Sequence, residues 1–226
     1  MGAFLRFVFG ILLLPACWGV SVALAGVLSV SCRMEACSLA FLGGVLAFVF
    51  CWILLSHPVK TYVLGHELTH ALWGLLFGAV PSKLRVRSNG GSVNLTKSNL
   101  LITLAPYFFP FYAVLVVLAA VLTSLFVRPL PCVPLWVFLV GFAWSFHVLF
   151  TFDSLMESQP DVNLYGRVFS WPFIFIANVL VVLAGLTCAT DYGFASLGRL
   201  LCRACASSYV GCWHGGAGLV SLIVHP

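Results

Sequence analysis

Residues 62–78 read YVLGHELTHALWGLLFG, an apolar run with two histidines and a glutamate at its centre. His66 and His70 are four positions apart, so on an α-helix their imidazoles lie on one face and can bind one zinc ion. Glu67 follows the first histidine and can accept a proton from a water molecule there as a general base. The stretch therefore predicts a helix that carries two zinc ligands, His66 and His70, and the catalytic residue Glu67.

These three ionisable residues have apolar neighbours on both sides. An ionisable group inside a membrane helix costs roughly 2.5 kcal/mol or more unless it is paired or faces a cavity. Such residues are expected to serve a function, and metal binding fits their spacing. The alternative is a polar packing cluster between helices, which needs no metal.

The rest of the chain is also apolar. Of its 226 residues, 62% are hydrophobic and only 8% are charged, against about 25% charged residues in soluble domains. A membrane span needs roughly 20 apolar residues. We expect an all-α, multi-pass membrane protein of one domain (residues 1–226), with a core at about 59–188 and a tail at 189–226. Six apolar segments predict six transmembrane helices, at about 7–30, 38–56, 59–79, 100–127, 132–152 and 168–188.

The first apolar segment can be interpreted in two ways. It starts after Arg6 and continues to about residue 30, whereas the apolar core of a signal peptide has about 7 to 15 residues. We therefore expect a retained transmembrane helix. Cleavage after residues 23–25, which read ALA, is the alternative.

The charges exclude one class of partner. Eleven Lys and Arg oppose six Asp and Glu, and the basic residues are scattered except for Lys83, Arg85 and Arg87. Nucleic-acid binding requires basic residues clustered on one face, so we expect no nucleic-acid partner. Anchoring at lipid headgroups is the expected role of these charges, with the bilayer, and most simply the cell membrane, as the location.

A short segment after the motif has a different pattern. In residues 82–98, apolar positions alternate with basic or polar ones, and the pair Asn89-Gly90 favours a tight turn. This period of two predicts a β-hairpin directly after the motif helix. A plain connecting loop is the alternative, because the strands would be short.

The motif also carries a family resemblance. Residues 65–72, which read GHELTHAL, followed by Phe77 and Gly78, resemble the motif helix of the site-2 protease class of intramembrane zinc metallopeptidases, peptidase family M50. The resemblance is close over this helix and extends to the layout of the following hairpin and helix. It implies zinc binding by His66 and His70, a general base at Glu67, and an aspartate ligand on a later helix.

A catalytic zinc ion has three protein ligands and a water molecule, so a third ligand is required. Asp161 is the first candidate because it precedes an apolar helix, where the resembling class has its aspartate, although that class has Leu-Asp-Gly and this chain has Pro-Asp-Val. Asp153 and Glu157 are the alternatives. Pro160 argues against a continuous helix that would carry Glu157 and Asp161 together. His147 is interpreted as a core histidine, with a supporting or ligand role as the alternative.

The tail contains a second group of metal-binding residue types. Cys202, Cys205, Cys212 and His214 form a C-x2-C-x6-C-x-H pattern, which fits no standard zinc module. We interpret them as ordinary tail residues, with a second metal site as the alternative.

These features predict a zinc metalloendopeptidase that hydrolyses peptide bonds of a membrane protein or peptide within or near the bilayer. Two alternatives differ in class. A catalytically inactive relative of the same fold would act as a membrane scaffold, and a metal-ion transporter would also place His and Glu on transmembrane helices.

Overall fold

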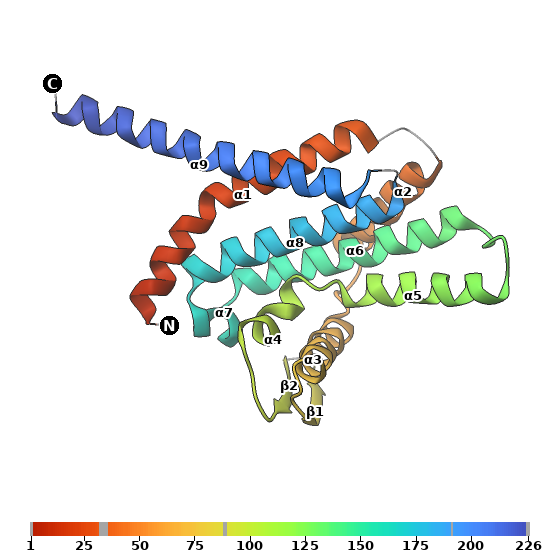
Figure 1. Ribbon diagram of the computed structural model, residues 1–226. Coiled ribbons are helices and arrows are strands. Elements are labelled where there is room, and N and C mark those ends of the chain that lie inside the picture. The colour runs from red at the N-terminus through yellow and green to blue at the C-terminus, as the bar shows by residue number, and fades with distance from the viewer. Residues whose placement is uncertain (1, 32–35, 88–89, 191, 225–226) are drawn as a thin grey trace. The chain divides into compact units, whose positions relative to one another are not determined.

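The computed structural model describes residues 2–31, 36–87, 90–190 and 192–224, most of which are helical (Figure 1). The chain forms two compact units, which we call the central unit (residues 33–161) and the terminal unit (residues 1–32 and 162–226). The described elements are α1 (Ala3–Ser31), α2 (Ala36–Leu54), α3 (Val59–Leu76), β1 (Pro81–Arg87), β2 (Gly90–Leu95), α4 (Leu100–Leu104), the 3-10 helix η1 (Ala105–Tyr107), α5 (Phe111–Phe126), α6 (Val133–Met156), α7 (Pro160–Tyr165), α8 (Arg167–Ala189) and α9 (Phe194–Val224).

The boundary between the two units falls inside the core predicted at 59–188. It does so because α8 packs against α1 and α9 in the terminal unit. A buried apolar cluster there joins side chains from α1, α8 and α9, among them Ala23, Leu183 and Ala204. Long-range packing of the first and last helices, which segment boundaries cannot reveal, therefore sets the division.

The central unit is organised around the close pairing of α2 and α6. Gly44 on α2 lies against the backbone of Phe138, and Gly141 on α6 lies against the backbone of Phe41, so a side chain at either glycine would collide with the facing helix. Small residues at such crossings let membrane helices approach closely. Phe48, Phe146 and Phe150 form a buried aromatic cluster beside this crossing. The side chains packed against it are Trp52, Tyr62, Tyr112, Phe142 and Leu149.

The predicted hairpin is confirmed. β1 pairs antiparallel with β2, from Pro81 opposite Leu95 to Arg87 opposite Gly90. An irregularity between Ser82 and Arg85 interrupts the strict alternation. Asn89, the first residue of the predicted turn, lies outside the described residues. Both strands pack against α3, so the hairpin lies beside the motif helix.

The segment predicted as one helix over 100–127 is instead bent. α4 and η1 precede α5, and their axes differ by 82° across the break. Two prolines explain the bend. Pro106 lies in η1 and Pro110 precedes α5, and neither can donate the backbone hydrogen bond that continues a helix.

The tail predicted at 189–226 contains a long helix, α9. Its pattern of cysteines is spread along that helix. Cys202 and Cys212 are ten residues apart, or about 15 Å along a helix axis. Together with Cys205 and His214 they therefore cannot converge on one ion, and the described residues contain no second metal-binding group of this kind.

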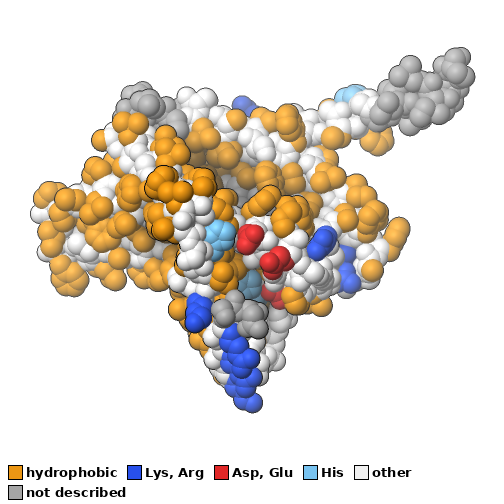
Figure 2. All heavy atoms as spheres, turned by 180° about the vertical axis from the view of Figure 1, so that it is seen from behind, with side chains coloured by type: hydrophobic (Ala, Val, Ile, Leu, Met, Phe, Trp, Pro, Cys, Tyr) orange, Lys and Arg blue, Asp and Glu red, His pale blue; other side chains and the backbone are white. Residues whose placement is uncertain are grey.

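Four described helices, α1, α2, α6 and α8, are long and apolar enough to cross a membrane, and the bent segment from α4 to α5 adds a fifth if it forms one span. The chain is therefore an all-α membrane protein with a two-stranded sheet. Six spans were expected, but the motif helix α3 is not among those found, because its histidines, Glu67 and Lys60 make it less apolar. Hydrophobic side chains cover much of the face seen in Figure 2, and basic side chains gather at its lower end. The basic residues Lys83, Arg85 and Arg87 of β1 are exposed. Exposed apolar helix surfaces are expected where lipid replaces water.

Candidate metal centre

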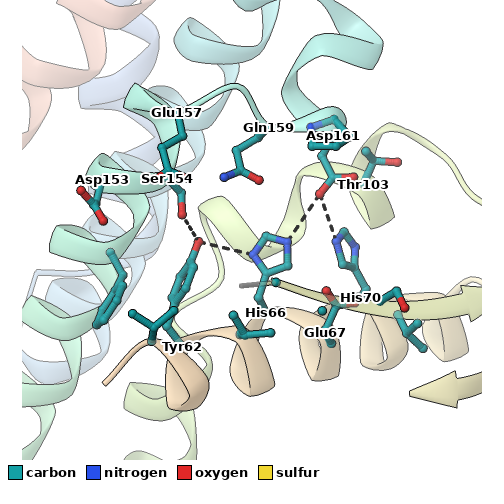
Figure 3. Close-up of a pocket in the computed structure, with 18 of the residues that line it drawn as sticks. Tyr62, His66, Glu67, His70, Thr103, Asp153, Ser154, Glu157, Gln159 and Asp161 are labelled. Carbon is teal, nitrogen blue, oxygen red and sulfur yellow. Dashed lines mark hydrogen bonds and ion pairs between the residues drawn. The ribbon is translucent and has the colours of Figure 1, made fainter. Parts of the chain in front are cut away.

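Three side chains of the central unit converge on one point (Figure 3). They are His66, His70 and Asp161, which we call the converging group. His66 and His70 lie one turn apart on α3, with ring centroids 4.9 Å apart. Asp161 approaches from the first turn of α7, and its Oδ2 lies 3.5 Å from His66 Nε2 and 3.3 Å from His70 Nε2. The histidine side chains are each 12% exposed and the aspartate is 29% exposed, so the group is accessible without being open to solvent on all sides.

The orientation of His70 follows from a proline. The carbonyl of Ile102 would normally accept a hydrogen bond from residue 106, but Pro106 has no N–H. That carbonyl instead lies 2.9 Å from His70 Nδ1. A carbonyl only accepts hydrogen bonds, so Nδ1 carries a proton, and Nε2 is the nitrogen that faces Asp161 at 3.3 Å. A ring nitrogen opposite a carboxylate oxygen suits a cation between them, either a shared proton or a metal ion.

The distances fit a zinc ion. Zinc binds imidazole nitrogen at about 2.0 to 2.1 Å and carboxylate oxygen at about 2.0 to 2.2 Å, so two ligands of a tetrahedral ion lie about 3.3 Å apart. The two nitrogen–oxygen separations are 3.5 and 3.3 Å, and all three ligand atoms lie within 4.8 Å of one another. Two imidazoles and one carboxylate are also a usual ligand set for catalytic zinc. The residues present therefore fit the metal.

Asp161 is held as a carboxylate. Burial disfavours its ionised form, but hydrogen bonds to the side chains of His66 and His70 outweigh burial and keep the pKa of Asp161 below its ordinary range. Asp161 follows Pro160, the first residue of α7, where an acidic side chain is favoured by the helix dipole. An ionised carboxylate is the form that binds a metal ion.

Two tyrosines contact this group. Tyr107 in η1 is fully buried, and its hydroxyl donates to Asp161 Oδ2 at 3.4 Å. Tyr62 lies one turn before His66 on α3, with its hydroxyl 3.4 Å from His66 Nδ1. Ser154 of α6 donates a hydrogen bond to the Tyr62 oxygen at 2.7 Å. These contacts tie the metal centre to two other elements of the central unit.

Glu67 lies beside the converging side chains and against the hairpin (Figure 3). It is only 7% exposed. A Cβ atom placed on Gly91 of β2 would lie 2.7 Å from Glu67 Cγ and 2.8 Å from Glu67 Oε1, so only glycine permits this close approach. The backbone N–H of Val93 also interacts with the carboxylate. The hairpin thus positions Glu67 at the edge of the metal centre.

A cavity of about 870 Å³ opens onto these residues. Its described lining includes four of the six acidic residues of the chain and no Lys or Arg. Asp153 and Glu157, the alternative third ligands, line this cavity but do not belong to the converging group. The four acidic residues are Glu67, Asp153, Glu157 and Asp161.

The sequence-based candidates therefore separate into two sets. The structure brings together His66, His70 and Asp161, with Glu67 adjacent, whereas His147 is a buried residue of α6 that lines a separate cavity of about 20 Å³ on another side of His66. Sequence reasoning missed both tyrosines. Tyr62 could have been found from its helical spacing to His66, but nothing local in the sequence links Tyr107 to Asp161.

Comparisons with known proteins provide no independent support. No family model matches the chain, and no curated protein or solved structure is significantly similar to it.

Proposed function

We propose that this chain is an intramembrane zinc metalloendopeptidase, similar to the site-2 protease class, that hydrolyses peptide bonds of membrane proteins or peptides. One observation carries the proposal: His66, His70 and Asp161 converge at distances suited to zinc, and Glu67 lies beside them in the same cavity. The helices that are apolar enough to cross a membrane support an integral membrane location, which we take to be the cell membrane.

The metal ion and Glu67 would have different chemical roles. Zinc, when bound, acts as a Lewis acid that polarises the scissile carbonyl and makes a water molecule more acidic. Glu67 accepts the proton of the attacking water and then donates it to the leaving amine. Its contact with the hairpin limits the positions of the carboxylate, which favours a defined proton path.

The cavity also suggests how a substrate is held. Gly90, Gly91 and Val93 of β2 line it, next to Glu67. A helical substrate hides its backbone, so the segment to be cleaved must unwind. An unwound segment could add to a strand of the hairpin through main-chain hydrogen bonds, which give affinity with little dependence on sequence.

The two other functions have less support. An inactive scaffold is favoured if no carboxylate approaches the histidines, whereas Asp161 lies 3.3 and 3.5 Å from them. A metal transporter is favoured by ionisable residues in several spans. Among the described residues, the acidic side chains gather around a single cavity.

The proposal is tested with Glu67→Gln in the full-length chain, purified in detergent and also co-expressed with a membrane substrate. We expect cleavage to be abolished while zinc content stays near one ion per chain, because the three ligands are unchanged. Glu157→Gln is the matched control, since it makes the same change in the same cavity outside the converging group. Undiminished cleavage by Glu67→Gln would rule out the proposed mechanism, and zinc uptake into vesicles that depends on His66 would indicate a transporter.

A further inference from the structure

Each of His66, His70 and Asp161 contacts one further polar group. The two histidines do so through Nδ1, and Asp161 does so through Oδ2. The three pairs are His70 with the Ile102 carbonyl, His66 with the Tyr62 hydroxyl, and Asp161 with the Tyr107 hydroxyl. We propose that Tyr107 and Tyr62 are positioning residues that orient Asp161 and His66 for a bound divalent metal ion. This inference rests on the metal centre of the proposed function.

Tyr107 supports an aspartate that has little local restraint. Asp161 is the second residue of α7, a helix of six residues, whereas Tyr107 is fully buried in η1. The tyrosine ring lies edge-on to the His66 ring, with centroids 5.3 Å apart, so it is packed against the motif helix. Its hydroxyl donates to Oδ2, the oxygen that faces both histidines. Tyr107 therefore directs this oxygen toward the imidazoles.

Tyr62 supports His66 in a similar way. Its ring stacks on Phe150 of α6 at 4.7 Å and 7°, and Ser154 donates to its oxygen at 2.7 Å, so the phenol group is held from two sides. When His66 binds a metal ion through Nε2, its proton is on Nδ1, which then donates to the Tyr62 oxygen. The Tyr62 oxygen can accept this proton, so the contact accommodates the tautomer that leaves Nε2 free for a metal ion.

Such outer contacts have measurable consequences. Residues that orient metal ligands typically change metal affinity by about 10- to 100-fold when they are replaced. A tyrosine that only fills space would have little effect when its hydroxyl alone is removed, because the ring remains. Tyr→Phe substitutions therefore separate positioning from packing.

The experiment measures zinc affinity of the detergent-solubilised full-length chain by competition with a chromophoric chelator. The visible spectrum of the Co²⁺-substituted protein provides a second readout, because it reports ligand geometry independently of catalysis. We expect Tyr107→Phe and Tyr62→Phe each to weaken zinc binding about tenfold or more and to shift the Co²⁺ bands. Ser154→Ala, which keeps both tyrosines, should shift the same bands by loosening Tyr62.

Tyr112→Phe is the matched control. Tyr112 also belongs to the central unit, but its hydroxyl donates to the Thr61 carbonyl at 2.6 Å rather than to a side chain of the converging group. Its zinc affinity and Co²⁺ spectrum should equal those of the wild type. The inference would be overturned if Tyr107→Phe, Tyr62→Phe and Ser154→Ala all kept the wild-type zinc affinity and Co²⁺ spectrum. That result would leave the proposed function intact. Failure of the wild-type chain to bind zinc would overturn both.

Discussion

Substitution of Gly91 by alanine tests whether the hairpin positions Glu67 for catalysis. A Cβ atom at this position would lie 2.6 Å from Val63 Cγ1, 2.7 Å from Glu67 Cγ and 2.8 Å from Glu67 Oε1. Ordinary contacts begin at 3.4 Å, so β2 and α3 must separate by at least about 0.7 Å at Glu67. Because Glu67 Cγ is near the helix backbone and Val63 is branched, a simple rotation of a side-chain end cannot relieve the collision.

The expected effect is large for activity and small for metal binding. A displacement of about 1 Å in a catalytic group can reduce the rate about 100-fold, which corresponds to about 2.7 kcal/mol of transition-state stabilisation. The three atoms nearest to the added methyl group belong to Val63 and Glu67, not to the metal ligands, so zinc content should remain near one ion per chain.

The assay compares kcat/KM for a peptide or membrane substrate with zinc content in the same preparations of Gly91→Ala and wild-type protein. Gly185→Ala is the control, because a Cβ atom at Gly185 in α8 meets no atom within 4 Å. Full activity in Gly91→Ala would refute the assigned contact between the hairpin and the general base. Parallel loss of zinc and activity would also contradict the reasoning, since the ligands should be unaffected.

Three further predictions follow from the central unit. Asp161→Asn should weaken zinc binding at least tenfold in a chelator-competition assay, because Asp161 belongs to the converging group. Asp153→Asn should leave zinc binding unchanged, and equal effects of the two variants would contradict this choice of ligand. Zinc affinity should fall as the pH falls below about 6.5, the ordinary histidine pKa, because protons compete with zinc at His66 and His70. The lowered pKa of Asp161 keeps that carboxylate ionised over the same range. Measuring zinc affinity at pH 5 to 8 checks this, and an affinity that does not change with pH would exclude histidine ligands. Gly44→Val should lower thermal stability by about 1 to 3 kcal/mol, because the larger side chain collides with the backbone of α6; an unchanged melting temperature in detergent would contradict the α2–α6 packing.

Much of the local structure could be predicted from the sequence. Five of the six apolar segments match single helices closely, and the alternation around residues 82–98 matches the hairpin. The remaining segment, at 100–127, is not one helix, because Pro106 and Pro110 break an otherwise apolar run. The same Pro106 frees the carbonyl that orients His70, so the missed break is part of the site.

The sequence alone determined that His66 and His70 share a helix face with Glu67 next to them, because helix periodicity relates residues one turn apart. It also determined that the chain is apolar enough for a membrane. Only the tertiary structure decided which carboxylate meets the histidines, since Asp161 is 91 residues beyond His70 and Asp153 is an equally plausible ligand by type. The tertiary structure likewise brought Tyr107 to Asp161 and Gly91 to Glu67. Such contacts depend on how separate elements pack, which local periodicity does not specify.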